Sequence, residues 1–157
     1  KAPQYRYDME PMSPRQASLK WFTHLVKKYQ RLAKEGQIYV FGVFNKKNEH
    51  IGTLDFTVIE RENMNWASVG YAVHNTFQKK GYAKEFVTAG LRLGFSQLGF
   101  KRIEAAINPK NRPSVNLAKS VGMKKECVRK KFYYENGTWT DYVIYTAISK
   151  NKKKDFE

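Results

Sequence analysis

The sequence holds few of the residues that metal centres and disulfides require. It contains one cysteine, Cys127, and three histidines among 157 residues. A single cysteine excludes an internal disulfide, and these scattered ligands form no recognisable metal-binding set. No segment approaches the run of about eighteen apolar residues that a membrane helix needs, and no charged-then-apolar leader precedes a cleavage site. We therefore expect no metal, no membrane span, no signal peptide and a cytoplasmic location.

Acidic residues are also scarce beside basic ones. Lys and Arg number 29 against 14 Asp and Glu, which gives a net charge of +15. This balance favours polyanionic partners such as RNA, a ribosome surface or a phosphate-rich cosubstrate. The basic residues form only short clusters, at Lys27-Lys28, Lys130-Lys131 and 152–154. A well-solvated basic surface is therefore as good an interpretation as a dedicated nucleic-acid patch.

The length and the 41% hydrophobic content predict one domain over residues 1–157, with a substantial core. We find no internal repeat and no linker. Residues 1–12 form an irregular lead-in without a clear period, and the charged tail at 149–157 is expected to fray.

Hydrophobic periodicity predicts the order helix, three strands, helix, strand, helix, hairpin. The capping sequence Ser13-Pro14-Arg15-Gln16 predicts the start of a long helix that stops at Gly36. Strands are predicted at 37–44, 50–60 and 66–73 as an antiparallel meander. A helix at 83–98, a strand at 101–108, a helix from Asn111 to Gly122 and a hairpin of strands at 123–134 and 139–148 follow.

The turn between strand 66–73 and helix 83–98 is polar and contains Gly81. Glycine lets the backbone approach a ligand closely, and a helix start aims unpaired N–H groups outward. Lys79 and Lys80 add positive charge, so the turn is a candidate phosphate site at the carboxyl end of a strand. A plain strand-turn-helix connection is the alternative, because Gln-x-x-Gly-x-Ala recurs by chance. The P-loop and Rossmann motifs are absent.

Three segments in this order resemble the GNAT acetyltransferases: Tyr71-Ala72-Val73, Gln78-Lys79-Lys80-Gly81-Tyr82-Ala83, and Asn111-Arg112-Pro113-Ser114 ending at Val121-Gly122-Met123. Further segments resemble the RimJ/RimL-like branch, the ribosomal-protein N-acetyltransferases: Gly70-Tyr71, Arg102-Ile103-Glu104-Ala105 and Gly137-Thr138-Trp139-Thr140-Asp141 with Tyr145. The resemblance runs from about residue 51 to 148. It implies an α/β (α+β) GNAT-like fold, a mixed and mostly antiparallel central sheet flanked by helices. The family's usual first strand is not recognisable here, so we expect it to be lacking.

The resemblance implies acetyl-CoA as cosubstrate. In the family the turn wraps the pyrophosphate, which assigns cofactor binding to Gln78, Lys79, Lys80, Gly81, Tyr82 and Ala83. The strand before the turn pairs with the pantetheine arm, which assigns Tyr71, Ala72 and Val73, and the backbone N–H of Tyr71 is the candidate that polarises the thioester carbonyl. Asn111 would contact the pantetheine and Ser114 would lie near the sulfur, although helix capping alone would explain both residues.

The implied reaction is direct attack of a primary amine on the acetyl thioester. Two positions depart from the family pattern: Ala118 stands where many members have a proton-donating tyrosine, and Ser68 where the branch often has an acid. Ser114 is therefore our candidate acid, and Glu104 a weaker candidate base with an ion-pair role as the alternative. His74 falls near the expected cleft and can equally be a solvated loop residue.

Three functional classes remain open from the sequence. The first is an N-acetyltransferase acting on a protein N-terminus, such as that of a ribosomal protein, or on a small-molecule amine. The second is a non-catalytic CoA-binding GNAT-like domain, and the third is a basic module that binds RNA or the ribosome. From the net charge of +15 we expect a neutral or acidic acceptor rather than a polyamine.

Overall fold

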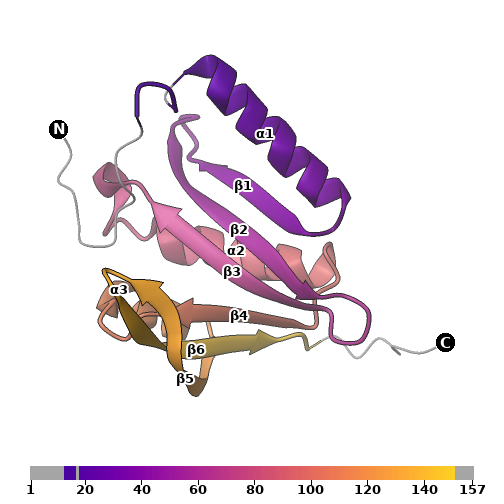
Figure 1. Ribbon diagram of the computed structural model, residues 1–157, viewed down its shortest axis with the longest axis vertical. Coiled ribbons are helices and arrows are strands. Elements are labelled where there is room, and N and C mark those ends of the chain that lie inside the picture. The colour runs from indigo at the N-terminus through magenta and orange to yellow at the C-terminus, as the bar shows by residue number, and fades with distance from the viewer. Residues whose placement is uncertain (1–12, 17, 151–157) are drawn as a thin grey trace.

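Six strands form one sheet in the order β1-β2-β3-β4-β6-β5 in the computed structural model, which describes residues 13–16 and 18–150 (Figure 1). The elements are α1 (Leu19–Lys34), β1 (Ile38–Phe44), β2 (His50–Glu60), β3 (Trp66–Val73), a 3-10 turn (Asn75–Phe77), α2 (Tyr82–Ser96), β4 (Arg102–Ile107), α3 (Arg112–Ser120), β5 (Lys124–Glu135) and β6 (Thr138–Ile148). The predicted strands at 50–60 and 66–73 match β2 and β3 to the residue.

One strand pair distinguishes this sheet from a simple meander. β3 and β4 run parallel, whereas every other neighbouring pair is antiparallel. Helix α2 makes the crossover between them, as a parallel connection requires. The parallel pairing covers Trp66–Ser68 of β3 and Arg102–Glu104 of β4. The mixed, mostly antiparallel sheet that the sequence predicted is confirmed.

The core lies on the face of the sheet that α2 covers, behind the strands in Figure 1. Leu54, Phe56 and Ile103 point into this face. Two glycines let α2 approach them closely. A Cβ at Gly90 would stand 2.5 Å from Leu54 Cδ1, and a Cβ at Gly94 would stand 2.7 Å from Ile103 Cδ1. Helix α1 lies at the β1 edge and buries none of its residues (Figure 1).

The predicted start of the first helix is wrong. Ser13 and Gln16 do exchange the bonds of a capping box, Ser13 N to Gln16 Oε1 at 2.9 Å and Gln16 N to Ser13 Oγ at 3.3 Å. These bonds close a separate turn, and α1 begins at Leu19 with Ser18 Oγ accepting from Trp21 N. A capping box satisfies only its own two N–H groups, so a second serine can cap the helix that follows.

Some expectations fall outside the described residues, namely the lead-in at 1–12 and the tail at 151–157. Within 13–16 and 18–150, no strand precedes α1. No helix in that part of the chain is both long and apolar enough to cross a membrane. The same residues bring no three His, Cys, Asp or Glu side chains together in a way that could hold a metal ion.

Candidate active site

A cavity of about 210 Å³ lies where β3 and β4 part. Its lining residues are Val69, Gly70, Tyr71, Ala105, Ala106, Ile107, Asn108, Asn111, Ser114 and Tyr142. Successive strand residues point to opposite faces. Because Gly70 and Tyr71, and likewise Ala106 and Ile107, are consecutive in their strands, the cavity is bounded by both faces. We call this cavity the opening between β3 and β4.

The backbone of β3 presents donors to this opening. His74 N donates to Ile51 O at 3.0 Å, which makes His74 and Ile51 a hydrogen-bonded antiparallel pair. The register between β2 and β3 is regular from Gly52 to Val58, so the direction of the N–H groups alternates along β3. The N–H group of Ala72 therefore points toward β2, whereas the N–H groups of Tyr71 and Val73 point toward β4. Of the three predicted pantetheine-pairing residues, two have their backbone donors on the side of the opening.

The turn after β3 forms a backbone cradle. Gly81 has φ +83° and caps α2, and a Cβ added there would meet nothing within 4 Å. Glu85 N donates to Gly81 O at 3.3 Å, so the N–H groups of the three residues before Glu85 precede the first helical bond. Gln78 Nε2 folds back onto Val73 O at 3.2 Å and Asn75 Oδ1 at 3.0 Å. Gln78 thus shapes the turn with its side chain, and the open space above Gly81 fits an anion held by backbone N–H groups.

Two hydroxyl groups lie at the opening, that of Ser114 from α3 and that of Tyr71 from β3, and we call them the hydroxyl pair. The predicted cap is confirmed, since Asn111 Oδ1 accepts from Ser114 N at 3.2 Å. The Tyr71 hydroxyl donates to the carbonyl oxygen of Ser114 at 3.3 Å. Burial raises the pKa of Tyr71, and hydrogen bonding to Ser114 offsets part of that rise. Tyr71 therefore remains a protonated donor at neutral pH, a role that the sequence analysis missed because it considered only the backbone of this residue.

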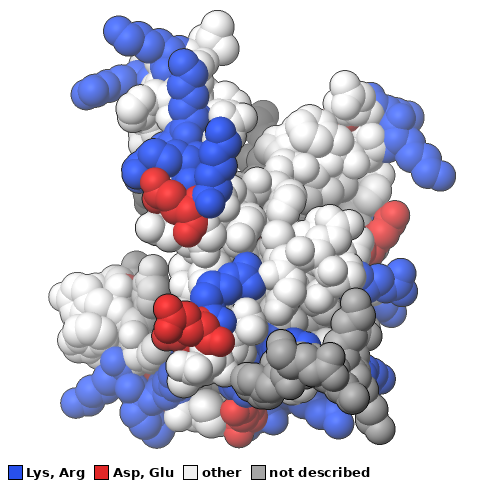
Figure 2. All heavy atoms as spheres, turned by 90° about the vertical axis from the view of Figure 1, so that its right-hand side faces the viewer, with Lys and Arg blue, Asp and Glu red and all other residues white. Residues whose placement is uncertain are grey.

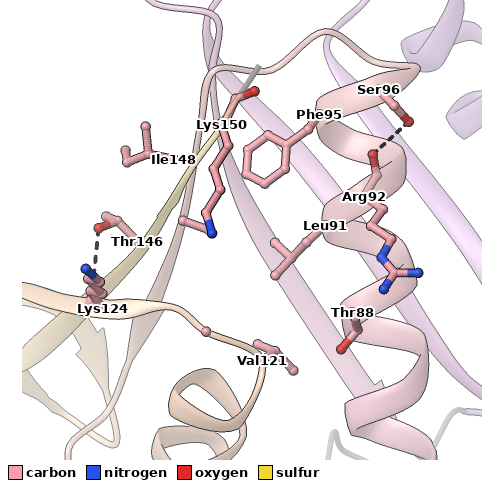
Figure 3. Close-up of a pocket in the computed structure, with 13 residues that line it drawn as sticks. Thr88, Leu91, Arg92, Phe95, Ser96, Val121, Lys124, Thr146, Ile148 and Lys150 are labelled. Carbon is pink, nitrogen blue, oxygen red and sulfur yellow. Dashed lines mark hydrogen bonds between the residues drawn. The ribbon is translucent and has the colours of Figure 1, made fainter. Parts of the chain in front are cut away.

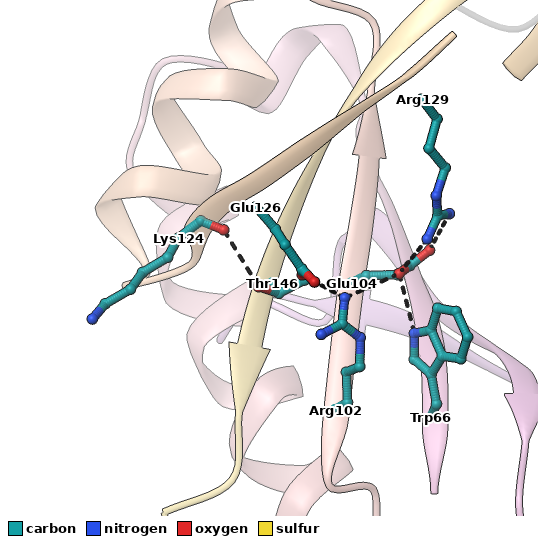
Figure 4. A network of polar contacts seen from close by, with 7 residues as sticks. All are labelled: Trp66, Arg102, Glu104, Lys124, Glu126, Arg129 and Thr146. Atoms are coloured by element: carbon teal, nitrogen blue, oxygen red, sulfur yellow. Dashed lines mark hydrogen bonds and ion pairs between the residues drawn. The ribbon is translucent and has the colours of Figure 1, made fainter. Parts of the chain in front are cut away.

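Glu104 lies at the paired end of β3 and β4, outside the cavity lining (Figure 4). Its side chain is 2% exposed and accepts from Arg129 Nη1 at 2.6 Å, Arg129 Nη2 at 3.0 Å and Trp66 Nε1 at 3.1 Å. The bond to Glu104 raises the pKa of Arg129. Arg102 lies 3.7 Å from Glu104 and pairs with Glu126. Both carboxylate oxygens of Glu104 are engaged, which favours the ion-pair alternative over the role of base.

Other residues that the sequence analysis weighed take structural places. Ala118 is fully buried in α3, so a tyrosine there would have no room. His74 Nε2 lies 3.1 Å from His50 Nδ1, and burial together with the charge of His50 lowers the pKa of His74. Sequence reasoning also missed Glu135, which accepts from Asn108 Nδ2 and from the Tyr142 hydroxyl at 3.3 Å. Only the fold brings this carboxylate beside the cavity.

A larger hollow of about 770 Å³ lies between α2 and the end of β6 (Figure 3). Thr88, Leu91 and Phe95 face it from α2, and Lys124 and Ile148 from the hairpin. It shares no lining residue with the opening between β3 and β4. It contains neither the cradle at Gly81 nor the hydroxyl pair of Tyr71 and Ser114, so the smaller cavity is our candidate site.

An opening between diverging parallel strands, beside a glycine turn that begins a helix, is the arrangement in which a CoA thioester can be held. A sequence profile of the acetyltransferase (GNAT) domain matches residues 2–124. The chain belongs to the GNAT acetyltransferase family. Enzymes of this family use acetyl-CoA and transfer its acetyl group to amines. The family that the three sequence segments indicated is confirmed.

Individual GNAT proteins resemble the chain over most of its length. The uncharacterized N-acetyltransferase p20 of Bacillus licheniformis is 32% identical over 120 residues, which is 76% of this chain and 67% of that protein. The ribosomal-protein-S5-alanine acetyltransferase of Vibrio fischeri has a TM-score of 0.81 at 26% identity, over 91% of this chain and 79% of that one. RimJ of Mycobacterium smegmatis, solved with CoA-disulfide, shares the fold with a TM-score of 0.80 at 22% identity, over 90% and 68% of the two chains.

Proposed function

We propose that this GNAT domain acetylates the α-amino group of a protein N-terminus, with acetyl-CoA held between the turn at Gly81 and the opening beside Tyr71. The observation that carries the proposal is that Tyr71 and Ser114 line one opening of about 210 Å³, where the Tyr71 hydroxyl donates to the carbonyl oxygen of Ser114. Acetyl-CoA would supply the acetyl thioester. The chain supplies the binding, the orientation and the proton transfers.

The phosphate end is held by the backbone. The N–H groups of Tyr82, Ala83 and Lys84 precede the first helical bond of α2, and their partial positive charge favours a pyrophosphate. Lys79 and Lys80 add screened charge at the rim, since both side chains are solvated. The N–H of Val73, which faces the opening, donates to the pantetheine arm as in strand addition. Asn111 holds the helix start that closes the other side.

We assign protonation of the sulfur to the hydroxyls of Ser114 and Tyr71, and deprotonation of the amine to a base beside the opening. The Tyr71 N–H donates to the developing oxyanion at the thioester carbonyl. Ser114 Oγ, with the Tyr71 hydroxyl beside it, donates a proton at the sulfur. An α-amino group, with an ordinary pKa of about 8, loses its proton more readily than a lysine at about 10.4. This difference favours N-terminal acceptors, and the Vibrio fischeri protein, a ribosomal-protein-S5-alanine acetyltransferase, supports the same class.

The basic surface affects which acceptors can approach the site. Figure 2 shows basic side chains gathered at the top of that view, where α1 lies, and again along its lower edge. α1 carries Lys20, Lys27, Lys28, Arg31 and Lys34 and no acidic residue. Such a surface repels polycations and can attract a ribosome or RNA-bound partner. We infer a neutral or acidic N-terminal segment as the acceptor, in preference to a polyamine.

The test is release of CoA thiol from acetyl-CoA with a panel of acceptors. The panel holds peptides with a free N-terminus, the same peptides blocked at the N-terminus but carrying an internal lysine, and spermidine. We expect turnover with free N-termini, weak turnover with blocked peptides and the least with spermidine. Faster turnover with spermidine than with every peptide would overturn the acceptor class. Tight CoA binding without turnover on any amine would instead indicate the non-catalytic alternative.

A further inference from the structure

Asp55 is a half-buried carboxylate on β2 that is not itself in the lining of the opening but lies next to a residue that is. In the antiparallel register it lies opposite Gly70 of β3. A Cβ added to Gly70 would stand 2.6 Å from Asp55 Oδ1 and 2.9 Å from Oδ2. The carboxylate therefore occupies the space that a side chain at position 70 would fill. Gly70 itself lines the opening.

The carboxylate approaches the opening from the face opposite to the hydroxyl pair. Leu54 and Phe56, the neighbours of Asp55 along β2, belong to the core that α2 covers, so Asp55 points to the other face. Ser114 reaches the opening from α3. The N–H of Tyr71, one residue after Gly70, points into the opening, between the Asp55 face and the Ser114 face. An acceptor that enters from the Asp55 face would meet the thioester across from the groups that protonate the sulfur.

Among the described residues, Asp55 has no cationic partner of the kind that three other carboxylates have. Glu104 pairs with Arg129, Glu126 with Arg102 and Asp141 with Lys130. Across residues 13–16 and 18–150, the Asp55 carboxylate forms no hydrogen bond or ion pair, although the Asp55 backbone is paired in the sheet. Burial raises its pKa above the ordinary value. Keeping an unpaired carboxylate half-buried costs stability, and a ligand cation would offset that cost.

The described residues that flank Asp55 in the sheet and those half-buried in α1 carry no charge at neutral pH. Val40 of β1 and Gly70 of β3 lie opposite it in the sheet. Thr53 and Thr57 flank it on the same face of β2. The diagonal positions on its neighbours are filled by Ile38 and Gly42 on β1 and by Ser68 and Ala72 on β3. The half-buried residues of α1, the helix that packs on β1, are Trp21, Leu25, Tyr29, Leu32 and Ala33, and none carries a charge at neutral pH.

We propose that Asp55 binds the ammonium group of the acceptor and takes the proton that this group loses before attack, an inference that rests on the proposed function. One proton passes from the ammonium nitrogen to an Asp55 oxygen, and the freed lone pair forms the C–N bond as the C–S bond breaks. The hydroxyl pair of Ser114 and Tyr71 protonates the sulfur and regains its proton from the attacking nitrogen. Asp55 returns its own proton to water. Asp55 thus supplies, from the neighbouring strand, the carboxylate that Ser68 does not provide.

Peptide binding tests the proposal without turnover. Calorimetry compares one neutral peptide carrying a free N-terminus with the same peptide N-acetylated, on the full chain saturated with CoA. We expect the wild type to bind the free amine at least about tenfold more tightly, since an ion pair in a half-buried site is stronger than one in water. Asp55→Asn should erase this discrimination and keep the affinity for CoA. The matched control is Glu135→Gln, a second carboxylate beside the cavity, which should retain the discrimination.

Kinetics and unfolding complete the test. Asp55→Asn should lower kcat/KM about a hundredfold, within the range for one acid–base group, while its melting temperature at pH 7 rises because an unpaired carboxylate is removed. Asp55→Glu, which keeps the charge but crowds Gly70, should recover part of the discrimination. Unchanged discrimination and kcat/KM within a factor of about two in Asp55→Asn would overturn the proposal, as would loss of discrimination in Glu135→Gln alone. Wild-type protein without turnover on any amine would overturn the proposed function instead.

Discussion

The two ends of the β3–β4 pair use carboxylates in opposite ways. At the paired end, Glu104 is 2% exposed and engages Arg129 and Trp66 with both oxygens. At the open end, Asp55 rests on Gly70 without a cationic partner among the described residues. Both side chains lie on the same face of one sheet. Glu104, whose oxygens have hydrogen-bonding partners, stabilises the fold. Asp55, which has no such partner for its carboxylate among the described residues, is available to bind a ligand.

The same contrast applies to the backbone. Where β3 and β4 pair, their N–H and C=O groups can satisfy one another across three residue pairs. Beyond Ser68 the strands part, and the N–H groups of Tyr71 and Val73 turn toward the gap. Donors without a strand partner can bind a substrate. Four changes test this division between a stabilising end and a binding end.

The largest effect is expected from Gly81→Trp. An indole above the cradle would occupy the space in which the N–H groups of the α2 start meet a phosphate, so CoA affinity should fall by more than about a hundredfold in calorimetry. Gly99→Trp is the matched control, because Gly99 also has a positive φ, +72°, with nothing within 4 Å of an added Cβ. It should lose comparable stability from backbone strain and keep its affinity. Wild-type CoA affinity in Gly81→Trp would remove the central claim about the turn.

Breaking the paired end should affect stability most. Glu104→Gln leaves Arg129 without its carboxylate, and we expect a loss of about 3 kcal/mol in the free energy of unfolding, measured with denaturant. Asp141→Asn removes an exposed pair with Lys130 and should change little. If Glu104 is instead the catalytic base, Glu104→Gln shifts the pH–rate profile of the folded enzyme, and that result would reverse our assignment.

At the open end, Ser114→Ala should lower turnover by about ten- to a hundredfold and leave CoA affinity nearly intact. The change removes only the hydroxyl, because Ser114 makes its bonds to Asn111 and Tyr71 through its backbone N–H and carbonyl oxygen. Tyr71→Phe, measured alongside, separates the two hydroxyls. Unchanged turnover in Ser114→Ala together with a large loss in Tyr71→Phe would make Tyr71 the proton donor.

The smallest effect is expected at the rim of the cradle. Replacing Lys79 and Lys80 by glutamine should weaken CoA binding only a few-fold, since exposed charges are screened by solvent and salt. The difference from wild type should shrink further as salt is added. A loss as large as that of Gly81→Trp would mean that side-chain charge, rather than the backbone, holds the phosphates.

Local signals in the sequence were sufficient for most of the fold. Alternation and turn residues located β2 and β3, and the Asn-Gly pair located the β5–β6 hairpin, because these depend on neighbours along the chain. The start of α1 was missed because the bonds of a capping box also close an isolated turn at Ser13. The turn at Gly81 could be recognised for the same local reason, a glycine before a helix start.

By itself, the sequence determined the order of elements and the glycine turn before α2, because each follows from spacing and conformational preference within a few residues, and its resemblance to known motifs indicated the family. Only the tertiary structure decided which carboxylates are paired. Glu104 meets Arg129 across the sheet, and Glu135 reaches the cavity through Asn108 and Tyr142. Asp55 meets Gly70 through strand register alone. The energy of a charge depends on what surrounds it in space, and those surroundings are assembled from strands distant in sequence.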